Sequence, residues 1–129
     1  MKAKFIELKK PLFGKYAGMV ILPYVFVYLK NKTEHQIKVL KNHENIHVAQ
    51  VNDEISKLGL ILGWLSFYSK YIGYWLKNVL GGYFSLKGKS SRQAYMDIPF
   101  EKEAYANERK LTYLEKRPKF AYKQYIDKK

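Results

Sequence analysis

The chain contains no cysteine, and only three of its 129 residues are histidines. Disulfides and thiolate ligands are therefore excluded, so that any bound metal ion must be held by histidine and carboxylate. Acidic residues are also scarce, since 11 Asp and Glu stand against 24 Lys and Arg. The search for a metal site is thus restricted to three histidines and eleven acids.

A signal peptide of the usual layout is also missing, because charges and Pro11 interrupt the apolar stretch that follows the early lysines. We therefore expect a cytoplasmic location. With 129 residues, of which 47% are hydrophobic, the chain is long enough for one core and short for two. We predict a single domain over residues 1–129.

The formal net charge of +13 creates a positive field that attracts anionic surfaces. Twelve tyrosines and seven phenylalanines lie among the lysines, a composition that suits a membrane interface or stacking on bases. Peripheral attachment to an anionic membrane is a candidate, and nucleic acid is a weaker one. A solubilising surface explains the charge equally well, and the oligomeric state is left open.

The amino-terminal part is β-compatible over Ala3 to Leu8 and again over Gly18 to Leu29. Pro23 interrupts the second run, which favours an edge or a bulge at that point. These runs predict a short β-hairpin or a two-stranded sheet at the start of the chain.

A helix is predicted to begin after Thr33, because Thr33 and Gln36 match a capping box. It should continue to about Lys57 and end at Gly59. A second apolar segment runs from Leu60 to Leu80, where Gly81-Gly82 should end it. Its small and cationic residues share one stripe of helical spacing: Gly59, Gly63, Ser66, Lys70, Gly73 and Lys77.

A helix with so narrow a polar stripe is either the buried centre of a fold or lies in or on a bilayer. Lys70 and Lys77 argue against a simple spanning helix. We favour a core helix, or a helix at an oligomer interface, over membrane association.

Further along, Lys87 to Gln93 is predicted to be an irregular, basic loop. Pro99 then predicts a helix start, and this helix should run to about Lys116, before Arg117-Pro118. One or two helical turns are expected after Lys119. The predicted fold class is α+β and mainly α.

The most informative stretch is His43-Glu44-Asn45-Ile46-His47, an H-E-x-x-H pattern inside the first predicted helix. Residues four apart lie on the same face of a helix, so the two histidines can share one zinc ion. Glu44 then lies beside the metal, where it can take a proton from bound water. Although the pattern can arise by chance, it favours a zinc-dependent hydrolase.

A catalytic zinc site needs a third protein ligand, which the same helix does not supply. Glu54 lies seven residues after His47, about 10 Å along the axis, which suits it better to position a neighbour. His35 lies eight residues before His43 and is predicted to be an exposed residue of the capping turn. The helix over residues 100–108 supplies carboxylates from elsewhere in the chain.

H-E-x-x-H followed by a downstream helix with E-x-x-A, here Glu101 to Ala104, resembles the gluzincin metallopeptidases. In closer detail, HENIHVAQ and YMDIPFEKEAY resemble a family of small zincin-like proteins of Bacteroidetes-type bacteria, over roughly residues 22–108. The resemblance implies a zincin-like helical core and a zinc-dependent metallopeptidase acting on peptide or protein. It implies His43, His47 and Glu101 as zinc ligands and Glu44 as general base.

One departure from the gluzincin pattern is Tyr105, which stands where many members have Asp supporting a histidine. If the glutamate of the pattern is instead placed two residues later, Glu103 becomes the third ligand, and Asn107 stands four residues after it, at the position of the supporting Asp. In a third interpretation both glutamates are solvated partners of lysine and arginine. Tyr95 or Tyr105 is a candidate donor to the oxyanion.

Two further hypotheses about the function stay open. The chain is either a non-catalytic basic protein, binding an anionic membrane or nucleic acid with a structural or vestigial metal site, or a peptidase-like scaffold that has lost activity. The small size of the chain favours the inactive scaffold over an active peptidase, because little chain is left to build a substrate cleft.

Overall fold

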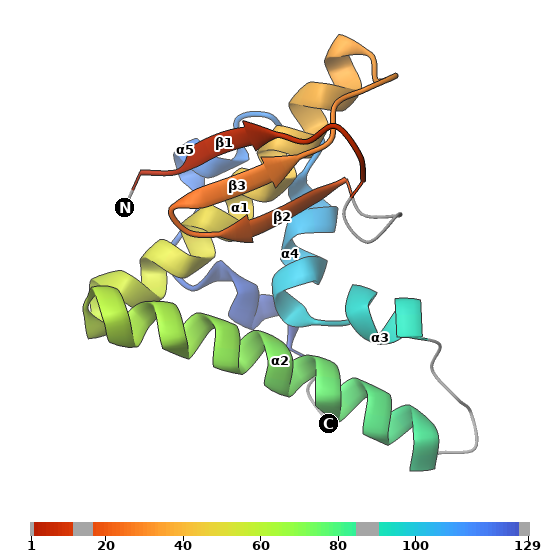
Figure 1. Cartoon of the computed structure of the whole chain (residues 1–129). Helices are drawn as coiled ribbons and strands as arrows, with labels where there is room; N and C mark the ends of the chain where they lie inside the picture. Colours follow the sequence, from red (N-terminus) through yellow and green to blue (C-terminus); the bar gives the residue numbers. More distant parts are fainter. Residues whose placement is uncertain (1, 12–16, 85–90, 127–129) are drawn as a thin grey trace.

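The computed structural model describes residues 2–11, 17–84 and 91–126. As predicted, the fold is α+β and mainly α (Figure 1). The elements in chain order are β1 (Lys4–Glu7), β2 (Gly18–Ile21), β3 (Tyr24–Val27), α1 (Glu34–Leu58), α2 (Leu60–Phe84), α3 (Ser91–Met96), α4 (Pro99–Asn107), α5 (Tyr113–Lys116) and the 3-10 helix η1 (Ala121–Tyr125).

The sheet has three strands in the order β1-β3-β2, so β2 is an edge strand. The two predicted β-runs do pair, but β1 pairs with β3 in parallel, so they do not form a hairpin with each other. The hairpin lies within the second run, where β2 and β3 pair antiparallel, and the sheet has three strands and not two. Pro23 lies in the tight turn between β2 and β3, after a cis peptide bond, and not within a strand at an edge or bulge. Val25 and Val27 alternate with more exposed neighbours and face the interior.

The capping box that begins α1 is confirmed. Thr33 N–H donates to Gln36 Oε1 at 2.9 Å, and Gln36 N–H donates to Thr33 Oγ1 at 3.1 Å. At the other end, Gly59 has a positive φ of 88°, and its N–H donates to Ile55 O at 2.8 Å. Glycine often ends a helix in this way, because it adopts positive φ values at lower cost than other residues.

α1 lies between the sheet and α2, which folds back after Gly59 (Figure 1). The two helices approach closely at Gly63, where a Cβ would lie 2.5 Å from the backbone nitrogen of Ile55. Glu54 of α1, which is fully buried, accepts from Lys70 Nζ at 2.6 Å and from Ser66 Oγ at 3.2 Å. The predicted stripe of small and cationic residues therefore joins α2 to α1 over its first half.

Of the two predictions for α2, the buried core helix is wrong, and the helix at an oligomer interface stays a prediction. Among the α2 residues whose side chains the structure describes, only Gly63 and Phe67 are buried, and the outward side is exposed and apolar. α2 also continues past Gly81-Gly82 to Phe84. Within the described ranges, no helix is long and apolar enough to cross a membrane.

The single helix predicted from Pro99 to about Lys116 is also wrong, since α4 ends at Asn107 and α5 begins at Tyr113. Asn42 of α1 explains the break, because its Nδ2 lies 3.3, 2.8 and 3.1 Å from the carbonyl oxygens of Asn107, Glu108 and Lys110. These carbonyls are turned toward α1 and away from a continuing helix.

The predicted loop from Lys87 to Gln93 lies partly outside the described residues, and its last three residues belong to α3. The expected turns after Lys119 are confirmed by η1.

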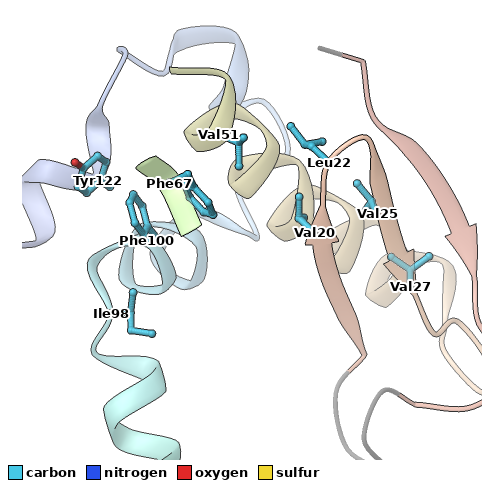
Figure 2. Packing of buried hydrophobic residues seen from close by; sticks show 9 residues of the cluster. All are labelled: Val20, Leu22, Val25, Val27, Val51, Phe67, Ile98, Phe100 and Tyr122. Carbon is cyan, nitrogen blue, oxygen red and sulfur yellow. The ribbon is translucent and has the colours of Figure 1, made fainter. Parts of the chain in front are cut away.

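The hydrophobic core joins the inner face of the sheet to α1, α2, α4 and η1 (Figure 2). Phe100 is fully buried at its centre, with ring centroids 4.6 Å from Phe67 and 4.3 Å from Tyr122. The cluster comprises Val20, Leu22, Val25, Val27, Val51, Phe67, Ile98, Phe100 and Tyr122. Since Phe100 immediately precedes Glu101, this packing fixes the start of α4 against α1.

Candidate metal centre

His43 and His47 lie one turn apart on α1, with ring centroids 4.9 Å apart and side chains that are almost fully buried. Glu101, in the first turn of α4, faces both rings. Its Oε1 is 3.1 Å from His43 Nε2, and its Oε2 is 3.0 Å from His47 Nε2. Ligand atoms of all three residues lie within 4.8 Å of one another, so this buried cluster could hold a metal ion.

The orientation of His43 is fixed by Glu108, whose Oε2 lies 2.8 Å from His43 Nδ1. An ionised carboxylate only accepts hydrogen bonds, so Nδ1 is the donor and Nε2 is the nitrogen that faces the cluster. Glu108 thus supplies the carboxylate support that is missing at Tyr105. The sequence pattern did not reveal this role, because Glu108 comes seven residues after Glu101 and not four.

His47 is oriented by Gln50, whose Oε1 lies 2.8 Å from His47 Nδ1. Gln50 Nε2 donates to Phe100 O and to Glu103 Oε1, each at 3.0 Å, and these two acceptors fix which end of the amide faces the histidine. Nδ1 of His47 is therefore the donor, and Nε2 keeps its lone pair.

The surroundings of His47 Nε2 show whether a metal ion would fit between these residues. His47 Nε2 is buried and forms no hydrogen bond with the described residues, although Glu101 Oε2 lies 3.0 Å away. A buried polar atom without a partner is costly in a folded protein. A cation bound between the two histidines and Glu101 would remove that cost, so the residues present fit a metal ion.

The electrostatics of the cluster favour a bound positive charge. Burial alone would lower the pKa of His43, but its hydrogen bonds to Glu101 and Glu108 raise it to about 10. Burial disfavours the ionised form of Glu101, yet His47 and His43 hold the pKa of that carboxyl well below its usual range. The site therefore attracts either a proton or a metal cation.

Tyr71 of α2 completes the surroundings of Glu101, to whose Oε2 its hydroxyl donates at 2.7 Å. Burial and the neighbouring Glu101 raise the pKa of this phenol well above its usual range, which keeps it a donor. No pattern in the sequence indicates this contact, because Tyr71 is one aromatic residue among many in an apolar helix. Only the packing of α2 reveals it.

Glu44 lies beside the cluster at the wall of a cavity of about 420 Å³. Burial raises the pKa of its carboxyl, although the two neighbouring histidines act in the opposite sense. The cavity is lined mainly by apolar and aromatic side chains of β2 and α2, together with His47, Glu101 and Tyr95. A group that enters this space therefore meets Glu44 and two members of the cluster.

Glu103, the alternative third ligand, is not in the cluster. It is fully buried and bound to Arg117, with Nε at 2.5 Å from its Oε2, and to the hydroxyl of Tyr113 at 2.8 Å. The interpretation of Glu101 and Glu103 as solvated residues is also wrong, since neither is more than 2% exposed. Asn107 donates to Glu103 O and does not approach the histidines.

The remaining predicted residues are clearly placed. His35 is exposed in the first turn of α1, outside the cluster, as expected. Of the two tyrosines considered as oxyanion donors, Tyr95 lines the cavity. Tyr105 packs edge-on against His43, with ring centroids 4.5 Å apart, and is 38% exposed.

The chain matches no family model, no curated protein and no solved structure.

Proposed function

We propose that the protein is a zinc-dependent metallopeptidase in which His43, His47 and Glu101 bind the metal and Glu44 is the general base. The observation that carries the proposal is the convergence of two Nε2 atoms and one carboxylate beside a cavity that is lined by His47, Glu101 and Glu44. The resemblance to gluzincins leads to the same four residues.

The ligand set favours zinc. Two imidazoles and one carboxylate, with a fourth position left for water, are typical of catalytic zinc sites. His43 Nε2 and His47 Nε2 lie 3.1 and 3.0 Å from the two oxygens of Glu101, so these three residues would hold the ion. When bound, zinc supplies a water of lowered pKa and polarises the carbonyl of the scissile bond.

Glu44 is placed to handle the proton in this reaction. It follows His43 directly in α1, so its carboxylate lies beside the metal ligands and faces the cavity. As general base it would accept a proton from the attacking water and then deliver it to the leaving amine. Tyr95 is the favoured donor to the developing oxyanion, since it lines the same cavity.

β2 supports a peptide as the substrate. It is an edge strand of the sheet, and all four of its residues line the cavity. An extended peptide can add to such an edge through backbone hydrogen bonds, with its side chains in neighbouring pockets. A peptide bound along β2 would pass Glu44, and the apolar cavity would accept an apolar side chain.

The decisive experiment compares zinc content and hydrolysis in three variants. We expect about one zinc per chain in the wild type and its loss in His43→Ala. Glu44→Gln should keep the zinc and lose hydrolysis of an unfolded protein substrate, followed by mass spectrometry of the fragments, by at least about 100-fold. His35→Ala is the matched control, since it removes an exposed histidine from the same helix.

Two results would contradict the proposal. Full hydrolysis by Glu44→Gln with intact zinc would remove Glu44 from the chemistry. Zinc bound by the wild type without cleavage of any peptide in a diverse library would instead identify an inactive scaffold with a structural metal.

A further inference from the structure

The outward side of α2 carries six large apolar side chains that are 44–73% exposed, here called the α2 outer face: Ile61, Leu62, Leu65, Ile72, Leu76 and Leu80. Their spacing places them on one stripe of a helix, and the stripe is about 28 Å long at 1.5 Å per residue. Ser69 and Gly73, also exposed, lie along it. A contiguous apolar surface of this kind marks an interaction site in a soluble domain.

We propose that the α2 outer face binds the surface of an anionic phospholipid membrane. The charge around it selects this partner. From residue 55 to 96 the sequence contains no Asp or Glu and six basic residues. Of the four in the part that the structure describes, Lys77 and Arg92 are exposed, Lys70 is paired with Glu54, and Lys57 lies on α1. Anionic headgroups complement this segment, and each basic residue near such a surface adds to the attraction.

The same charges oppose a second copy of the chain as the partner. A symmetric dimer through α2 would place one basic, acid-free segment against another, and like charges at an interface are unfavourable. Lys70 is held by Glu54, but Lys77 and Arg92 are exposed. Helices that lie in a membrane interface typically combine an apolar stripe with flanking charges that are positive and not negative.

The packing of α2 also determines its orientation. The opposite side of the helix is joined to α1 through Gly63 and the Lys70–Glu54 ion pair, so the outer face can only lie flat on a surface. Both tryptophans of the chain, Trp64 and Trp75, are on α2 and half-buried. Trp64 donates to Leu22 O at 3.1 Å and Trp75 lines the cavity, so both lie beside the outer face and not on it.

Co-sedimentation with vesicles tests the proposal on the full chain. We expect binding to vesicles of phosphatidylcholine mixed with phosphatidylglycerol, and weaker binding to phosphatidylcholine alone. The triple variant Leu62→Ser, Leu65→Ser, Leu76→Ser should lower the partition coefficient at least about tenfold. The matched control changes three exposed apolar residues elsewhere, Phe5, Ile6 and Leu111, to Ser and should bind like the wild type.

Two measurements do not depend on the folding of the triple variant. Tryptophan fluorescence of the wild type reports only on α2, and brominated lipid in the mixed vesicles should quench it. Lys77→Glu should weaken binding to the mixed vesicles severalfold, whereas Lys30→Glu, an exposed change before α1, should have a smaller effect.

Several outcomes would overturn the proposal. One is wild-type protein that does not bind the mixed vesicles, and another is a folded triple variant that binds as well as the wild type. A dimer in light scattering that becomes monomeric in the triple variant would assign the face to a second copy. Binding to duplex DNA in preference to vesicles, lost in the triple variant, would assign it to nucleic acid.

Discussion

Gly18 of β2 lies directly against the carboxyl group of Glu44. A Cβ built at Gly18 would overlap Oε1 of Glu44 and lie 2.7 Å from its Cδ. Glu44 is buried against this strand and borders the cavity, so an added Cβ would push its carboxyl into that space. The edge strand thereby sets the position of the proposed general base.

Gly18→Ala should therefore displace Glu44 while leaving the three metal ligands in place. We expect hydrolysis to fall by at least about tenfold, because general base catalysis depends on hydrogen-bond distance to the water, and zinc content to stay at the wild-type value. The measurement is the cleavage rate per bound zinc. Gly73→Ala, where an added Cβ meets nothing within 4 Å, is the control and should keep wild-type activity.

Glu108→Ala should weaken zinc binding, because it removes the acceptor that holds His43 Nδ1. Loss of a group that supports a metal ligand typically costs 10–100-fold in metal affinity. Competition with a chromophoric chelator measures this change, and Glu108→Gln should recover part of the affinity. Glu115→Ala, an exposed change in α5, should bind zinc normally; equal affinities for both alanine variants would remove Glu108 from the site.

Arg117→Met should destabilise the fold strongly. The guanidinium of Arg117 joins Glu103 and Asp53, whose side chains are at most 8% exposed. Its removal leaves two buried carboxylates without their cation, a change that typically costs about 3–5 kcal/mol. Urea unfolding measures the free energy difference, and Arg109→Met, at an exposed position, should stay within about 0.5 kcal/mol of the wild type.

The stability should also fall at alkaline pH through Tyr68. Its hydroxyl donates to Val20 O at 2.7 Å, and burial raises its pKa to about 12. In the unfolded chain the phenol ionises near pH 10, so between about pH 10 and 12 the unfolded state loses a proton that the folded state retains. The free energy of unfolding therefore decreases as pH rises through this interval.

Tyr68→Phe tests this linkage in two ways. It should cost about 1 kcal/mol at neutral pH, because the hydrogen bond is lost, and it should flatten the decrease of stability above pH 10. Urea unfolding at both pH values measures both effects. A slope as steep as that of the wild type would show that Tyr68 does not contribute to it, and Tyr24→Phe on the exposed side of β3 serves as control.

Features set by neighbouring residues could be predicted from the sequence. The capping box of Thr33 and Gln36, the end of α1 at Gly59, and the shared face of His43 and His47 all depend on contacts within one or two turns. The resemblance to gluzincins implied Glu101 as the third ligand, and in the structure Glu101 lies next to both histidines.

Features set by distant contacts could not be predicted in this way. α4 ends early because Asn42, on another helix, binds the carbonyls of Asn107 and Glu108. The contact of Tyr71 with Glu101 depends on how α2 packs. The apolar composition of α2 fits burial and exposure equally well, and only the position of its neighbours decides between them.

Ile72 contributes both to the lining of the cavity and to the α2 outer face. The cavity thus borders the surface that we propose to bind lipid, and both share one side chain. A change at this position would disturb catalysis and attachment together, whereas Leu65 and Leu76 belong to the outer face without lining the cavity. Detergent molecules that cover the α2 outer face should therefore change the turnover rate, because they would bind beside the cavity. The metal and its ligands would stay undisturbed.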